Sequence, residues 1–217
     1  MDHRIRGEVA RAELEELGAK HYLDVRATIR RMLESLPGGS CAAFAAAITE
    51  RVHQGGPGSD AGEARDVDAL VASARPLLDT VWDGVLGSPD ADESVAQSLA
   101  HFYQSRYLCT HRHDDPASMA DHVAMTSLYT AECYLHGCWE FAAWNGWRGF
   151  DAAAIRAAGD DLWPHRRPIS ITTYGWELAH PLVQGELERQ LEDIELLTGS
   201  DTEAVKLSSD LVDRLRA

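Results

Sequence analysis

The sequence has no long hydrophobic run and no cysteine pairs of the kind that mark redox or zinc motifs. No stretch reaches the roughly 18 consecutive apolar residues of a membrane-spanning helix, and Met1 to Glu8 lead into no apolar signal-peptide core. The four cysteines, Cys41, Cys109, Cys133 and Cys138, include no CxxC spacing. We therefore expect a cytoplasmic protein whose cysteines remain free thiols in a reducing compartment.

Motifs for nucleophilic catalysis and phosphate binding are also absent. The chain contains no GxSxG, no GxxxxGK[ST] and no GxGxxG. Cys133 and Cys138 fall in a helical pattern without a base signalled nearby, which argues against a cysteine nucleophile. The sequence thus names no catalytic residue and leaves open whether the protein is an enzyme.

Positive charge is scarce. Twenty basic residues face 35 acidic ones, which gives a formal net charge of −15. This balance disfavours binding to nucleic acids and to anionic membrane surfaces, because both would be repelled. It suits a soluble protein or one with a basic protein partner.

What the sequence does have is a helical period. One apolar stripe on a helix expected over about 116–143 is made by Ala124, Leu128, Ala131, Leu135, Cys138 and Ala142. Its small residues would let a neighbouring helix approach closely, within the chain or across the axis of a homodimer. We expect an all-α, single-domain bundle of about seven or eight helices.

The bundle is expected to have two parts. Residues 1–39 form an N-terminal helical extension, and residues 40–217 form one compact helical domain with a flexible loop near 54–65. Within the domain, helices are expected at Ala42–Val52, across Val67–Val85 with a kink or break at Pro76, and at about 182–197 and 201–215. Ile169–Tyr174 is an extended segment without a partner strand.

Three stretches resemble a known family. They are the apolar helix Phe44–Val52 ending in Glu50-Arg51, the segment Leu77–Asp83 with its leucine, aspartate and tryptophan, and the C-terminal segment His180–Leu197. In this order they are similar to the bacterial domain-of-unknown-function family 416, the YjaG-like proteins. The resemblance implies a compact, all-helical cytosolic protein, and it implies no reaction or catalytic residues.

One candidate metal site is the cluster His111-Arg112-His113-Asp114-Asp115. Imidazole and carboxylate ligands suit a divalent zinc, iron or manganese ion. The alternative is that Asp115 caps a helix begun by Pro116, with His111 and His113 on the surface before it.

A second candidate is the row Glu132, His136 and Glu140, which would stack along one helix at a spacing of four. The alternative is a solvated polar face. We take His111, His113, Glu132 and His136 as the metal candidates, and expect no cofactor unless these groups converge on a divalent metal.

The aromatic residues between 139 and 176 are candidates for a binding surface, since tryptophan and tyrosine are enriched at interfaces. The segment Asn145–Gly149 is expected to be a turn that presents the rings. The alternative is core packing. The Pro164–Pro168 segment adds a basic pair, which suits an anion. The candidate binding residues are Trp139, Trp144, Trp147, Trp163, Arg166, Arg167, Tyr174 and Trp176.

Two hypotheses follow. The first is a non-catalytic protein of the immunity or regulatory type, which binds a basic partner through an acidic, tryptophan-rich surface. The second is a small-molecule-binding protein or metal-dependent enzyme, with a pocket beneath the 139–176 segment. We favour the first because no catalytic motif is present.

Overall fold

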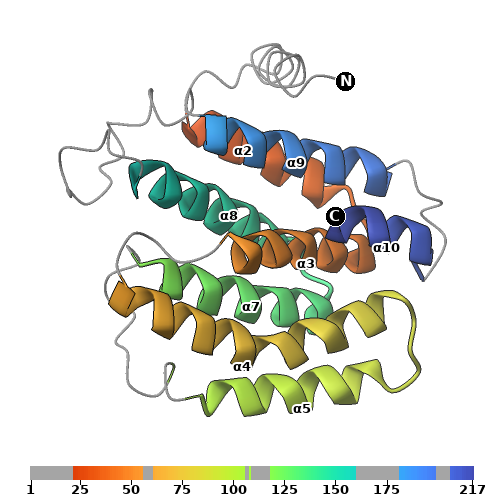
Figure 1. Cartoon of the computed structure of the whole chain (residues 1–217). Coiled ribbons are helices and arrows are strands. Elements are labelled where there is room, and N and C mark those ends of the chain that lie inside the picture. The colour runs from red at the N-terminus through yellow and green to blue at the C-terminus, as the bar shows by residue number, and fades with distance from the viewer. Residues whose placement is uncertain (1–21, 56–60, 106–107, 109–117, 160–180, 199–205) are drawn as a thin grey trace.

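The structure is a computed structural model that describes residues 22–55, 61–105, 108, 118–159, 181–198 and 206–217 (Figure 1). This part of the chain contains helices and no strand. The helices are α2 (Tyr22–Glu34), α3 (Gly38–Gln54), α4 (Ala61–Val85), α5 (Ala91–Tyr103), α7 (Met119–His136), α8 (Trp139–Gly159), α9 (Pro181–Thr198) and α10 (Ser209–Arg216). The predicted all-α class is confirmed.

The helices form two groups on either side of α3. On one side α2, α8 and α9 pack together, and on the other side α4, α5 and α7 do so (Figure 1). Helix α3 contacts α7 and α8 most extensively, and it also touches α4, α9 and α10. No described helix is long and apolar enough to cross a membrane.

Helix α3 is buried along almost its whole length. Every residue from Ser40 to Glu50 is buried, and Val52 is as well. Five of these twelve side chains are alanines, whose small size lets other helices approach the α3 backbone from several directions. At the start of α3 the approach is closest, because a Cβ added to Gly38 would lie 2.9 Å from the Cα of Gly137. The centre of the bundle is therefore a helix with almost no solvent face.

The helix predicted over about 116–143 is in fact two helices. Gly137 has a φ of 60° and ends α7, with its amide donating to the carbonyl of Cys133. This left-handed cap is the geometry that glycine adopts without strain. The predicted stripe is divided accordingly: Ala124, Leu128 and Ala131 are buried on α7, and Ala142 is buried on α8.

The turn predicted at Asn145–Gly149 is wrong, because these residues lie inside α8. The two glycines suggested a loop, but both sit where α8 meets its neighbours. A Cβ at Gly146 would lie 3.1 Å from Gln190 Oε1, and one at Gly149 would lie 2.7 Å from Ile48. Glycine here permits close helix packing and does not end the helix.

Helix α4 runs through Pro76 without a break. Figure 1 shows the ribbon bending about half-way along, as expected when proline removes one backbone hydrogen bond. Helix α4 begins at Ala61, within the stretch 54–65 that was expected to be a loop. The C-terminal predictions are closer: α9 covers 182–197 in full, and α10 covers the end of 201–215.

The N-terminal helix α2 packs against α8 and α9. Its side chains Ile29 and Leu33 are buried in the same core as those of α3. The expected boundary at residue 39 falls inside α3, which begins at Gly38.

A buried network of polar side chains fixes the register of α3, α7 and α8. Asn145 Nδ2 lies 2.7 Å from Thr130 Oγ1 and 3.0 Å from the carbonyl oxygen of Ala45. Thr49 and Thr130 share a hydroxyl–hydroxyl bond of 2.8 Å. Asn145 and Thr49 are fully buried, so sliding one helix past another would leave these groups without partners at a large energetic cost.

A second polar cluster joins α3 to α4 and α10 through one carboxylate. Glu50 is 4% exposed. It accepts hydrogen bonds from Arg75 at 2.7 Å and from the indole nitrogen of Trp82 at 3.0 Å, and it pairs with Arg216 at 3.3 Å. Arg75 and Arg216 also pair with Asp79. The C-terminal helix is thus held to the core by a shared buried charge.

We predict that Glu50→Gln lowers the free energy of unfolding by about 3 kcal/mol, because it leaves a partly buried cluster of two arginines without its central anion. Chemical denaturation measures the change. Glu93→Gln is the control, since Glu93 is exposed and accepts a hydrogen bond from the exposed Gln97, and it should change stability by less than about 0.5 kcal/mol. Equal, small effects of both substitutions would show that the cluster contributes little.

Candidate functional site

Aromatic side chains gather on the surface formed by α5, α7 and α8. Trp144 is 42% exposed and Tyr103 is 49% exposed, while Tyr129 and Phe141 are half-buried. The rings of Phe141 and Trp144 meet edge to face at 5.3 Å, and Tyr129 lies 5.4 Å from Trp144. We call Tyr103, Tyr129, Phe141 and Trp144 the aromatic face.

Two polar residues link the α5 and α8 ends of this face. Tyr103 donates a hydrogen bond of 3.4 Å to Glu132, and His136 Nε2 lies 3.1 Å from the other carboxylate oxygen of Glu132. The ring of His136 is 6.5 Å from that of Phe141. The aromatic face is therefore continuous from α5 across α7 to α8, with Glu132 and His136 between the exposed rings.

The metal candidates are only partly placed by the structure. Glu132 and His136 lie together on α7, as their spacing predicts. Glu140 does not continue their row, because Gly137 ends α7 and Glu140 belongs to the first turn of α8. His111 and His113 lie outside the described residues. Within the described ranges, no group of three or more metal-ligating side chains is close enough to hold an ion.

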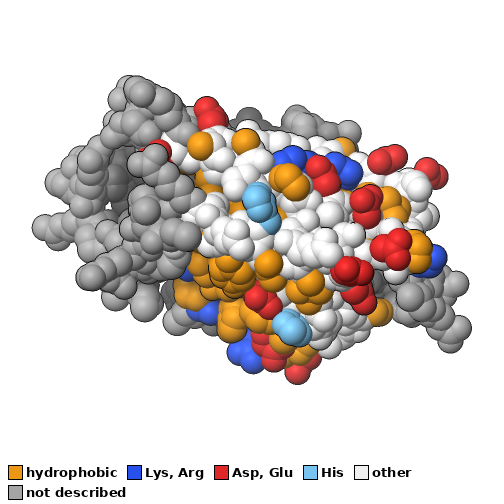
Figure 2. All heavy atoms as spheres, turned by 90° about the horizontal axis from the view of Figure 1, so that it is seen from below, with side chains coloured by type: hydrophobic (Ala, Val, Ile, Leu, Met, Phe, Trp, Pro, Cys, Tyr) orange, Lys and Arg blue, Asp and Glu red, His pale blue; other side chains and the backbone are white. Residues whose placement is uncertain are grey.

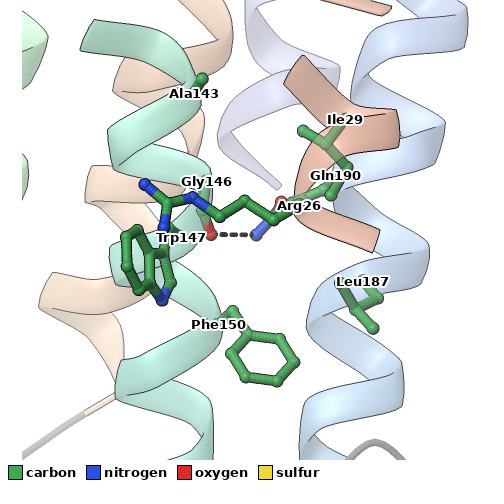
Figure 3. A pocket seen from close by; sticks show the side chains of 8 residues that line it. All are labelled: Arg26, Ile29, Ala143, Gly146, Trp147, Phe150, Leu187 and Gln190. Carbon is green, nitrogen blue, oxygen red and sulfur yellow. Dashed lines mark hydrogen bonds between the residues drawn. The ribbon is translucent and has the colours of Figure 1, made fainter. Parts of the chain in front are cut away.

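The three described tryptophans of the predicted cluster lie on α8 but do not share one surface. Trp144 belongs to the aromatic face, whereas Trp139 and Trp147 are half-buried beneath arginines of α2. The guanidinium carbon of Arg30 is 4.9 Å from the ring centre of Trp139, and that of Arg26 is 3.2 Å from Trp147. Figure 3 shows Arg26 crossing from α2 to lie against Trp147.

The rest of the predicted binding set, Trp163, Arg166, Arg167, Tyr174 and Trp176, lies outside the described residues. Sequence reasoning missed Tyr103, Tyr129 and Phe141. The available signal was weak: Met125, Tyr129, Glu132 and His136 recur at helical spacing along α7, and none of them is buried.

Acidic side chains are numerous on α4 and on α5, the helix that carries Tyr103. Between residues 66 and 105 the chain has one basic residue, Arg75, and seven acidic residues, all of them exposed: Asp66, Asp68, Asp79, Asp83, Asp90, Asp92 and Glu93. Asp92 accepts a hydrogen bond of 2.9 Å from Tyr134 of α7. Figure 2, viewed from the α5 side, shows acidic groups collected toward one end, with hydrophobic side chains next to them.

Buried charges elsewhere connect helices. Arg51 donates to Glu186 at 3.0 Å and to Asp193 at 2.8 Å, which joins α3 to α9. Burial raises the pKa of Asp193 to about 6, although the nearby Arg51 charge lowers it. For Asp193 the desolvation therefore outweighs the attraction of Arg51.

The described cysteines are free thiols with little nucleophilic character. Cys41 and Cys133 are fully buried, and Cys138 is half-buried. Burial raises the pKa of Cys41 to about 12, and it also raises that of Cys133. A thiol that stays protonated at neutral pH is a poor nucleophile and metal ligand. Cys109 lies outside the described residues.

Compared with known protein families, curated proteins and solved structures, the chain matches none of them. The resemblance to the domain-of-unknown-function family 416 stays a prediction. The quoted stretches do meet in space, since Glu50 bonds Trp82 and Arg51 bonds Glu186. Their contacts hold helices together, which is a structural role for these residues.

His53 yields a prediction of pH-dependent stability. Its Nε2 lies 3.1 Å from Ser127 Oγ, and burial lowers its pKa from 6.5 to about 4. The unfolded chain therefore takes up a proton at a higher pH than the folded chain. Stability contributed by neutral His53 is present above pH 6.5 and is lost as the pH falls towards 4.

We expect the difference in unfolding free energy between the wild type and His53→Gln to change by about 3 kcal/mol between about pH 7 and about pH 4. Comparing the two proteins isolates the contribution of His53 from that of Asp193. The pKa of Asp193 is raised, so its effect on stability has the opposite sign over part of this pH range. A difference that stays constant with pH, measured by urea denaturation, contradicts the assignment.

Proposed function

We propose that this protein is a non-catalytic interaction protein that binds a basic protein partner through the aromatic face. The observation that carries the proposal is the clustering of exposed rings. Among the described residues three large hydrophobic side chains are exposed, and two of them, Tyr103 and Trp144, belong to this face. Chance exposure would scatter such side chains over the surface.

The face has the chemistry of a binding anchor. Tyrosine and tryptophan carry much of the energy of protein interfaces, because they bury large areas with few rotatable bonds. The ring of Trp144 packs against those of Phe141 and Tyr129, which also lie 6.1 Å from each other. A ring already fixed in place loses little conformational entropy on binding.

The negative charge of α4, α5 and the whole chain indicates the nature of the partner. Seven exposed carboxylates lie between residues 66 and 105 beside one arginine, Arg75, which is already paired with Glu50 and Asp79. The whole chain carries −15. Such a field attracts a positively charged protein, accelerates its association and disfavours acidic partners. We place this encounter in the cytoplasm, which the free thiols support.

The test starts with capture of partners from a cell extract by the wild-type protein and by Trp144→Ala. A protein retained only by the wild type is then purified, and its binding is measured by calorimetry. We expect a partner with a basic isoelectric point. Its Kd should rise at least about tenfold with Trp144→Ala, and should rise with salt up to about 0.5 M.

Leu182→Ala is the matched control. Leu182 is 46% exposed on α9, outside the aromatic face, so its truncation should leave the Kd within about twofold. The proposal fails if every partner binds Trp144→Ala as tightly as the wild type. It also fails if the partner that depends on Trp144 is acidic or binds independently of salt.

A further inference from the structure

Arginines of this chain stack on its tryptophans. On α8, the guanidinium carbon of Arg26 lies 3.2 Å from the ring centre of Trp147, a pair that Figure 3 shows from close by. The guanidinium carbon of Arg30 lies 4.9 Å from the ring centre of Trp139. A guanidinium is attracted by the negative face of an aromatic ring, and its flat shape allows close stacking. Two of the three tryptophans of α8 are therefore covered by a cation.

The tryptophan of α4 shows the same arrangement with a carboxylate added. The guanidinium carbon of Arg216 lies 5.6 Å from the ring centre of Trp82, and its Nε pairs with Glu50 at 3.3 Å. The indole nitrogen of Trp82 donates to the same carboxylate at 3.0 Å. An aromatic ring and an acid thus hold one arginine together, the ring by stacking and the acid by charge.

Trp144 differs from these three tryptophans, because within the described ranges no arginine or lysine lies over its exposed ring. Arg148 follows one turn later on α8 but does not stack on it. Helices α5 and α7, which carry Tyr103 and Tyr129 of the aromatic face, contain no lysine or arginine. A cation for Trp144 therefore has to come from outside these helices.

A carboxylate for the same cation is present. Glu132 follows Tyr129 by three residues on α7, so the two side chains share one side of the helix, and the ring of Tyr129 lies 5.4 Å from that of Trp144. Tyr103 donates to one oxygen of Glu132 at 3.4 Å, and His136 lies 3.1 Å from the other. A carboxylate oxygen accepts two hydrogen bonds, so each oxygen has capacity for a further donor.

We propose that the partner presents an arginine to the aromatic face, with its guanidinium stacked on Trp144 and hydrogen-bonded to Glu132. The inference rests on the proposed function, since it names the side chain through which the basic partner binds. The net charge of −15 favours any cation. The ring and the carboxylate favour arginine over lysine, because a planar guanidinium stacks and donates two parallel hydrogen bonds, whereas an ammonium has no flat face.

Two capped peptides of equal charge, a tri-arginine and a tri-lysine, test the choice of side chain. Each is titrated into the intact protein, and binding is followed by the NMR signal of the Trp144 indole group, which is assigned by its loss in Trp144→Phe. We expect the Kd of the arginine peptide to be at least about threefold lower than that of the lysine peptide. Equal Kd values overturn the proposal, and so does the absence of saturable binding of the arginine peptide.

Two substitutions locate the preference, with binding followed by calorimetry. In Trp144→Leu the two peptides should bind equally, because the stacking surface is gone. Glu132→Gln should reduce the preference, since it keeps the shape and removes the charge. Glu93→Gln is the matched control, because it removes the same charge from an exposed position on α5 and should leave the ratio of the two Kd values unchanged. An arginine preference that persists in Trp144→Leu contradicts the proposal.

The comparison of the two peptides on the wild-type protein remains decisive if a variant fails to fold. It also separates this inference from the proposed function. If the peptides bind equally while a basic partner still depends on Trp144, the function stands and the arginine is wrong. If no captured partner depends on Trp144, the proposed function fails, and the assignment of the partner's arginine fails with it.

Discussion

The whole bundle depends on a helix that has almost no contact with water. Eleven consecutive side chains of α3, from Ser40 to Glu50, are buried, and five of them are alanines. Small side chains let α7 and α8 pack against the α3 backbone while α4, α9 and α10 complete the enclosure. The same closeness makes each position intolerant of added volume, because overpacking forces neighbouring backbones apart. Polar groups at the end of α3 then determine where α4, α9 and α10 dock.

Those polar groups show what the family-like stretches do in the fold. Glu50 and Arg51 are adjacent, so they leave α3 in different directions, one towards Arg75 and Trp82 and the other towards Glu186 and Asp193. Each buried charge is met by an opposite charge. Such pairs contribute less to stability than their geometry suggests, but breaking one is expensive. They therefore specify which helices pack against α3.

The fold class was predictable from the sequence because helical periodicity reports directly on burial. Helix α9 followed from its period of Val183, Leu187, Leu191 and Ile194, all of which are buried. The end of α7 at Gly137 was not foreseen, because the apolar stripe continues through it. The glycines of α8 were misread as a turn, since their close contacts with Ile48 and Gln190 depend on helices distant in the sequence. Trp144 was predicted to be a binding residue from its residue type alone, and that stays a prediction; the rings it contacts required the three-dimensional structure.

Native-state hydrogen exchange followed by NMR tests the central claim about α3 most directly. The account predicts that amides of Ala43 to Ala47 exchange only when the whole protein unfolds, with the same free energy that denaturant unfolding gives. Amides of α5 and α10, at the edges of the bundle, should exchange through smaller, local openings. If the α3 amides exchange with a lower free energy than those of α5, then α3 is not the element on which the other helices depend.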